Sequence, residues 1–172
     1  MLSSSVDDGL TFYCSFDDSI NAVKAAGPAS GVSTYGSKTE FASGIKNKGL
    51  RIGRSADGKI KHSISYTGTK NINHKQGTIC FWIKPEDWEP TSKDFNIFVT
   101  GLKKQGCFFI YEYQGNTARF YIKDNDKQSN SIASTAAWKK GKWYHLAVSW
   151  NPQMQQIYVN GKLINTVKRP GD

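Results

Sequence analysis

Tyrosines alternate with basic residues along two successive segments of the chain, a combination suited to contact with sugars. In an extended strand Arg119, Tyr121 and Lys123 share one face, because successive side chains point to opposite sides. Tyr111 and Tyr113 share one face of the preceding segment for the same reason. Aromatic rings stack on the apolar faces of pyranose rings, while Arg and Lys donate hydrogen bonds to hydroxyl or sulfate groups. These five residues are candidate ligand contacts, although cross-strand pairing alone also explains the pattern.

Three further candidate contacts lie in two other segments rich in apolar residues. Alternation along residues 142–150 leaves Trp143 and His145 on the face away from the predicted core. There they could reach a ligand, or a packed Trp and a hydrogen-bonded His could lie beneath a loop. Trp82, in the segment 77–85, is the third candidate. The core face of residues 142–150 is predicted to carry Tyr144, Leu146, Val148 and Trp150.

Size and charge limit the classes of protein that remain. At 172 residues the chain has the size of one domain, and no linker rich in Gly, Ser or Pro divides it. We therefore expect a single domain over residues 1–172. The formal charge of +9 attracts polyanions through a field that salt screens. Acidic glycans, nucleic acid and anionic lipid are all possible partners for that charge. The lysines could equally form a solvated surface that binds nothing in particular.

Cysteine usage and hydropathy indicate a protein that needs no disulfide and does not insert into a membrane. Cys14, Cys80 and Cys107 each lie inside an apolar run, where buried free thiols are expected rather than a bridge. No run of about 18 apolar residues is present to span a bilayer. Residues 1–10 lack the basic start and apolar stretch of a secretion signal, but they could follow a removed leader, so the compartment stays open.

The elements that must position these side chains are short strands. Period-two alternation recurs in runs bounded by Gly, Asn, Asp and Ser, which is typical of antiparallel strands in a sandwich. Residues 77–85 are apolar on both faces and predict a central strand, while residues 18–48 predict a long surface loop with one weak strand. Asn160-Gly161 is a strong hairpin signal. The predicted strands are 10–17, 49–54, 59–66, 77–85, 95–100, 107–114, 117–124, 142–150, 156–159 and 162–167, with further turns at 57–58 and 114–116.

Three segments carry a family resemblance: GLTFYCSFD at 9–17, GTICFWIKP at 77–85, and GKWYHLAVSW at 141–150 running into IYVNGK at 157–162. In this order they resemble the laminin-G-like branch of the concanavalin A-like lectin and glucanase superfamily. The resemblance covers nearly the whole chain and implies an all-β jelly-roll sandwich of two curved antiparallel sheets. It also implies a module often attached to glycan-degrading enzymes, sialidases or adhesins, in an extracellular, periplasmic or cell-surface location.

Two features of the family bear on particular residues. Many members hold a structural calcium, which takes several oxygen donors at one place, and the match of the first segment implies Asp17 and Asp18 as ligands. The acidic cluster at 124–126 could also supply a few oxygen ligands, although a solvated turn is the favoured interpretation there. Members usually continue past the Asn-Gly hairpin into a strand that returns beside the first one, whereas this chain ends at Asp172. We therefore expect a truncated chain or a strand supplied by another segment or chain, since unpaired edges are normally avoided.

The sequence does not indicate catalysis. Enzymatic relatives cleave glycans with a Glu-x-Asp-x-Glu arrangement on one strand, which holds acid and nucleophile about 5 Å apart. No such triplet occurs, and Glu112, the one Glu inside a convincing strand, has no acidic partner two or four residues away. Nucleophile-elbow, metalloprotease and phosphate-loop motifs are absent too. We expect a protein that is not an enzyme.

The sequence therefore predicts a non-catalytic, lectin-like module for polysaccharide or glycan, with acidic chains favoured by the basic surface. A structural or adhesive module that contacts protein stays an alternative. Nucleic-acid binding is a weaker one, because the charge and the aromatic residues fit but no RNP-like or helix-turn-helix signal occurs. A glycoside hydrolase is disfavoured by the missing carboxylates.

Overall fold

The protein is an all-β chain in the computed structural model, which describes residues 9–33, 39–54, 61–86, 96–103, 106–113, 116–124 and 127–169. Over these ranges the chain forms antiparallel strands and turns without an α-helix, so the predicted fold class is confirmed. None of the described segments is a helix long and apolar enough to cross a membrane. The chain divides into two compact units, Met1–Asn73 and His74–Asp172, and the single-domain organisation stays a prediction.

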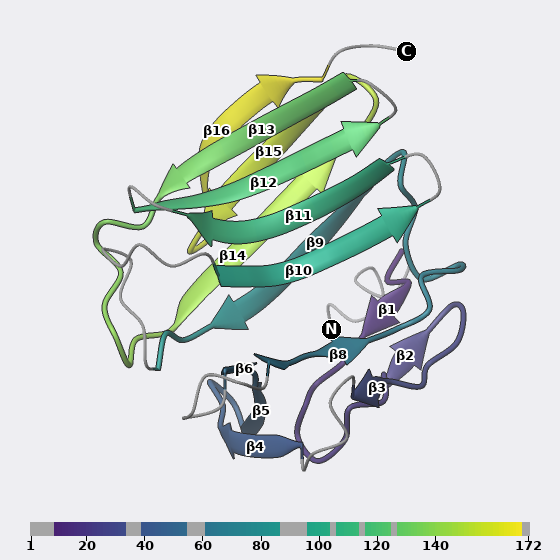
Figure 1. Ribbon diagram of the computed structural model, residues 1–172, viewed down its shortest axis with the longest axis vertical. Helices are drawn as coiled ribbons and strands as arrows, with labels where there is room; N and C mark the ends of the chain where they lie inside the picture. The colour runs from purple at the N-terminus through teal and green to yellow at the C-terminus, as the bar shows by residue number, and fades with distance from the viewer. Residues whose placement is uncertain are drawn as a thin grey trace, which may run out of the picture. The chain divides into compact units, whose positions relative to one another are not determined.

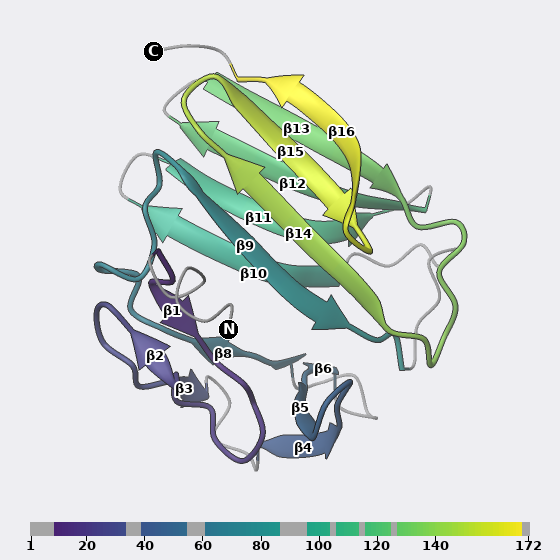
Figure 2. The same ribbon diagram turned by 180° about the vertical axis from the view of Figure 1, so that it is seen from behind.

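Two four-stranded antiparallel sheets make up the unit His74–Asp172. The first sheet contains, in spatial order, β10 (Asn96–Lys103), β11 (Gly106–Tyr113), β12 (Thr117–Asp124) and β13 (Lys127–Ser134). The second contains, in spatial order, β16 (Lys162–Lys168), β15 (Met154–Val159), β14 (Tyr144–Trp150) and β9 (Gly77–Ile83). The sheets form two layers of a sandwich: the first lies in front in Figure 1 and the second in Figure 2.

The core lies between the two sheets and is built from alternate residues of each strand. The ring of Trp150 lies 6.2 Å from that of Phe108 and 5.8 Å from that of Phe120, measured between centroids. The predicted core face of β14 is confirmed for Leu146, Val148 and Trp150. The buried apolar side chains of this unit are Phe108, Ile110, Ala118, Phe120, Ile122, Ala133, Trp138, Leu146, Val148, Trp150 and Ile157. Because the inner faces bury the apolar set, the outer faces are left to water or a ligand.

A buried amide links the two sheets. Gln155 of β15 is fully buried, and its Oε1 accepts a hydrogen bond from Ser129 Oγ at 2.6 Å. Its Nε2 donates to Phe120 O at 2.8 Å. Ser129 belongs to β13 and Phe120 to β12, so both bonds run from the second sheet to the first. This burial is tolerated because both polar atoms of the amide have partners.

The hairpin of β15 and β16 turns at Asn160 and Gly161, as predicted. Their φ angles are positive, 50° and 77°, which the favoured two-residue hairpin turn requires. The turn is also attached to β14, because Asn160 N donates to His145 O at 2.8 Å and Asn160 Oδ1 accepts from His145 N at 2.9 Å. It thus fixes the backbone of a candidate contact residue.

The unit Met1–Asn73 contains short strands in its described part. The antiparallel pairs are β1 (Phe12–Tyr13) with β2 (Lys24–Ala25), β3 (Val32–Ser33) with β8 (Ile64–Ser65), β4 (Glu40–Ser43) with β5 (Lys48–Arg51), and β6 (Gly53–Arg54) with β7 (Lys61–His62). The buried side chain of Asn71 ties their connections together. Its Oδ1 accepts from Gly27 N at 2.8 Å, and its Nδ2 donates to Pro28 O at 2.8 Å and to Thr67 O at 3.0 Å.

The strands of this unit differ from those predicted. The loop expected at 18–48 contains β2, β3 and β4. The strand expected at 10–17 is reduced to β1, because Phe16 has a φ of 57° that turns the chain, and Leu10 at the other end is 38% exposed. Among the described residues β1 pairs with β2, and the extra strand beside it stays a prediction. The turn at 57–58 lies outside the described residues.

Two further differences concern the second unit. The predicted central position of residues 77–85 is not observed, because among the described strands β9 pairs only with β14 and forms an edge. The second difference is β13, a strand that the sequence did not predict. Its inward positions carry Ser129, Ser131 and Ala133, whose small side chains do not produce the apolar alternation by which strands are recognised.

The three cysteines are free thiols, as predicted, but none of them is buried. Cys80 is exposed because its position in β9 faces outward, and Cys14 and Cys107 are half-buried. Cys14 Sγ donates to Asn21 O at 3.4 Å, which gives this thiol a polar rather than an apolar neighbour.

Candidate functional site

The candidate contacts on β11 and β12 lie together on the outer face of the first sheet. Tyr111 is directly opposite Arg119 in the register of the two strands, and Tyr121 and Lys123 follow on the same face of β12. The other face of β12 carries the buried side chains of Ala118, Phe120 and Ile122. We call Tyr111, Arg119, Tyr121 and Lys123 the Tyr–Arg strip. Tyr113 ends β11, and its side chain is not among those that the structure describes.

Neighbouring side chains hold the Tyr–Arg strip in position. Arg119 Nε donates to Thr117 Oγ1 at 3.1 Å, from the same face of β12. Tyr121 OH donates to Gln128 Oε1 of β13 at 2.9 Å, and its ring centroid lies 6.3 Å from that of Phe109 on β11. Arg119 and Tyr121 are half-buried. Their orientation is therefore fixed while part of each side chain stays open to solvent.

The candidates Trp82 and His145 lie on the outer face of the second sheet. They are directly opposite each other in the register of β9 and β14, and their rings meet edge to face at 5.1 Å between centroids. Trp82 is 48% exposed. On the same face Tyr158 OH donates to Gln156 Oε1 at 2.9 Å, and Gln156 Nε2 donates to Thr166 Oγ1 at 3.2 Å. This face therefore combines one open indole with a hydrogen-bonded polar surface.

Trp143 lies just before β14 and contacts a residue of the same unit. The Nζ of Lys84 is 5.2 Å from the centroid of the Trp143 ring, which is within the range of a cation–π contact. The neighbouring Tyr144 stacks on Trp138 with centroids 4.5 Å apart and planes at 7°. Tyr144 is half-buried, so its predicted place in the core is wrong.

The candidate contacts thus divide between opposite faces of the sandwich. The Tyr–Arg strip occupies one outer face, and Trp82 and His145 occupy the other. Stacked sheets lie about 10 Å apart, so one saccharide unit cannot touch both sets. Alternation identifies outward positions on each strand, but the strand order decides which of them share a face.

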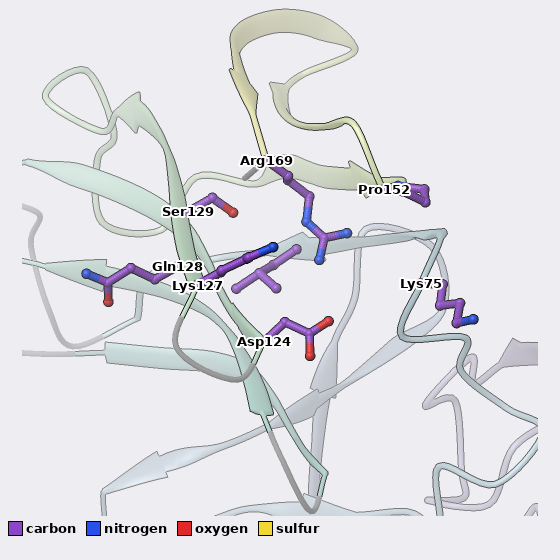
Figure 3. A pocket seen from close by; sticks show the side chains of 8 residues that line it. Lys75, Asp124, Lys127, Gln128, Ser129, Pro152 and Arg169 are labelled. Atoms are coloured by element: carbon purple, nitrogen blue, oxygen red, sulfur yellow. The ribbon is translucent and has the colours of Figure 1, made fainter. Parts of the chain in front are cut away.

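A further set of polar side chains gathers at one end of this sandwich, and the sequence analysis did not identify it. Lys127 begins β13, Asp124 ends β12, Arg169 follows β16 and Lys75 precedes β9. Together with Gln128 they line a notch of about 40 Å³, shown in Figure 3. The residues come from segments far apart in the chain, so no motif or spacing could have indicated the notch.

The predicted calcium ligands, in the first unit, already have partners. Asp18 Oδ1 forms an ion pair with Lys48 Nζ at 2.5 Å, and Asp17 Oδ1 accepts a hydrogen bond from Lys48 N at 3.2 Å. The hydrogen bond with Asp18, followed by the charge of that carboxylate, raises the pKa of Lys48. Within the described ranges no three His, Cys, Asp or Glu side chains come together. These carboxylates therefore fit a calcium ion only if Lys48 moves away and other oxygens complete the ligand set.

Calcium binding at Asp17 and Asp18 stays a prediction, and Lys48 provides its test. Ligand binding to the folded state raises the melting temperature, so calcium should stabilise the protein relative to EDTA. The gain should be larger in Lys48→Gln, where no ammonium competes, and should be lost in Asp17→Asn. Thermal unfolding followed by fluorescence gives the melting temperatures of the wild type and of both variants. Equal melting temperatures with calcium and with EDTA in the wild type and in Lys48→Gln would rule out this site.

The family of the chain follows from its sequence. The family model described as the concanavalin A-like lectin/glucanases superfamily matches residues 54–172, so the chain belongs to this superfamily, and the resemblance is confirmed. Among solved structures the chain is similar to domain 4 of AbnA, an extracellular GH43 arabinanase from Geobacillus stearothermophilus, in complex with arabinotriose. The TM-score is 0.65 at 18% identity, covering 92% of this chain and 74% of that one, which shows a shared fold. A search of curated protein sequences found no match.

Proposed function

We propose that the protein is a non-catalytic, lectin-like module that binds an oligosaccharide on the Tyr–Arg strip. The observation that carries the proposal is the common outward face of Tyr111, Arg119 and Tyr121 on adjacent strands. A half-open tyrosine ring beside a positioned guanidinium can stack on a sugar and hydrogen-bond its hydroxyls at the same time.

The length of the strip suits an extended ligand. From Arg119 to Lys123 the strand rises by about 13 Å, so more than one sugar unit fits along it. Lys123 is exposed and adds a cation at the end of the strip. The basic surface as a whole, with a formal charge of +9, favours acidic polysaccharide among the possible ligands.

The placement of the carboxylates supports a non-catalytic role. Glycoside hydrolysis generally requires a pair of carboxyl groups flanking the scissile bond. Glu112 of β11 is fully buried on the inner face, where its Oε2 accepts a hydrogen bond from Asn96 Nδ2 at 3.2 Å. The described outward positions of β11 and β12 carry no Asp or Glu. We expect no release of reducing sugar from any polysaccharide that the protein binds.

The structural relative supports the same class of ligand and location. It was solved with a trisaccharide and belongs to an extracellular enzyme. We infer that the present protein is likewise extracellular, periplasmic or at the cell surface, as an accessory module that holds a larger assembly on its polysaccharide.

The test compares the two outer faces. Isothermal titration against a panel of neutral and acidic oligosaccharides identifies a ligand, and the same titration is repeated with Tyr121→Ala. Loss of the ring should weaken binding about tenfold, equivalent to about 1.4 kcal/mol, since a favourable aromatic contact contributes about that much. Trp82→Ala is the matched control, because it removes an exposed ring from the opposite face.

Two outcomes would contradict the proposal. If Trp82→Ala loses affinity while Tyr121→Ala does not, the site lies on the second sheet. If no oligosaccharide binds and a protein partner is captured instead, the module is adhesive. The second outcome has some support from the apolar side chains exposed on the second sheet, Trp82, Leu163 and Ile164.

A further inference from the structure

The notch at the end of the sandwich has an excess of positive charge. Lys75, Lys127 and Arg169 line it, against the single carboxylate of Asp124. In Figure 3 the side chains of Arg169, Lys127 and Asp124 extend toward the same space, whereas Lys75 lies at the other side of the notch. At about 40 Å³ the notch holds only a few atoms, since one water occupies roughly 10–15 Å³ on such a measure. The space suits a carboxylate rather than a whole sugar ring.

Arg169 is held in place before any ligand arrives. Its N donates to Gln153 O at 2.9 Å, and its Nη1 donates to Asn151 O at 2.8 Å. Asn151 Oδ1 in turn accepts from Gln153 N and Met154 N, both at 2.9 Å, which stiffens the turn between β14 and β15. A planar guanidinium pairs with a carboxylate through two parallel hydrogen bonds, and a fixed guanidinium loses little freedom in doing so.

The notch and the Tyr–Arg strip meet at the start of β13 but lie on opposite faces of it, since in Figure 3 the side chain of Gln128 extends away from that of Lys127. Gln128 lines the notch, and its Oε1 accepts the hydrogen bond from Tyr121 OH. Gln128 is also the partner of Lys123 in the register of β12 and β13. A saccharide that lies on Tyr121 and crosses β13, the edge strand of its sheet, at Gln128 therefore reaches Lys127 and Arg169.

We propose that the notch binds the carboxylate of a uronic acid unit in an acidic saccharide whose neighbouring units lie on the Tyr–Arg strip. Arg169 pairs with the carboxylate, and Lys127 and Lys75 supply positive charge around it. The inference rests on the proposed function and deepens it, because it makes the notch the determinant of preference for acidic over neutral chains.

The test uses two probes that differ only in the charged group: trigalacturonate and its fully methyl-esterified form. The wild type should bind the acid form about tenfold more tightly at low salt, since a hydrogen-bonded charge pair contributes about this much. The preference should shrink as salt is added. In Arg169→Gln and in Lys127→Gln it should fall to about threefold or less, with ester binding unchanged. Lys168→Gln removes the same charge from the exposed residue next to Arg169 and should keep the full preference.

The outcomes separate the inference from the proposed function. Binding of both probes with equal affinity, or a preference that survives in Arg169→Gln and in Lys127→Gln, overturns the inference and leaves saccharide binding intact. If the wild type binds neither probe and no other oligosaccharide, both the inference and the proposed function are wrong. Inorganic phosphate is the competing anion: if it displaces trigalacturonate at equal concentration, the notch is a general anion site rather than a site for a sugar carboxylate. Because Lys127 is exposed, its variant keeps the test valid if Arg169→Gln fails to fold.

Discussion

Replacing Gln155 by Ala should lower the free energy of unfolding of the second unit by about 2–4 kcal/mol. The substitution leaves Ser129 Oγ and Phe120 O without the amide that now bonds both of them inside the core. A buried polar group that loses its partner costs about 1–3 kcal/mol, and the cavity left by the shortened side chain adds to the loss. Urea unfolding followed by tryptophan fluorescence measures the change, because Trp150 lies in the same core.

Gln156→Ala is the matched control for Gln155→Ala. Gln156 is the next residue of β15, but it is half-buried on the outer face, where it bonds Thr166 and Tyr158. Surface substitutions usually change stability by less than about 1 kcal/mol. Equal losses in the two variants would show that the bridge between the sheets does not stabilise them.

Replacing Asn71 by Ala should destabilise the first unit by about 3 kcal/mol. The side chain is 8% exposed and makes three hydrogen bonds, to Gly27, Pro28 and Thr67, whose backbone groups would each lose a partner. Asn71→Asp should be at least as destabilising at neutral pH, because its buried carboxylate would face the carbonyl oxygens of Pro28 and Thr67 without a donor. Differential scanning calorimetry is the appropriate measurement, since it counts the transitions as well as their midpoints.

The same calorimetry tests whether the chain is one domain. If residues 1–172 unfold as one cooperative unit, Asn71→Ala and Gln155→Ala should shift a single transition. Two transitions, each moved by only one of the variants, would show that the two compact units are separate domains. An unchanged thermogram in Asn71→Ala would contradict the stabilising role of the amide.

Alternation predicted the second unit well because large apolar residues occupy its inward positions. Leu146 and Val148 are buried as expected, Phe120 and Ile122 are buried on the face opposite Arg119 and Tyr121, and the strand at Thr117–Asp124 has the predicted bounds. Strand β13 was not predicted, because its inward positions carry serine and alanine. In the first unit the strands are only two to four residues long, too short for a period to emerge, so the chain between them looked like loop.

The candidate site was predictable only in part. The outward orientation of Arg119 and Tyr121 follows from alternation within one strand, and their partnership with Tyr111 follows from the hairpin. The separation of these residues from Trp82 and His145 depends on strand order, which no local pattern contains. The charged residues that line the notch with Arg169, namely Lys75, Asp124 and Lys127, are more than 40 residues away along the chain, so only the folded chain reveals the notch.

The small side chains of β13 also close one margin of the sandwich. Ser129, Ser131 and Ala133 let β13 lie close against β15 and β16, and Ile132 N reaches Asn165 Oδ1 of β16 at 3.5 Å. Along the other margin the layers are held apart by aromatic rings, with Phe81 of β9 and Phe98 of β10 meeting at 6.2 Å between centroids. One margin of this unit is therefore closed by small side chains along β13 and β16, and the other is filled by aromatic rings between β9 and β10.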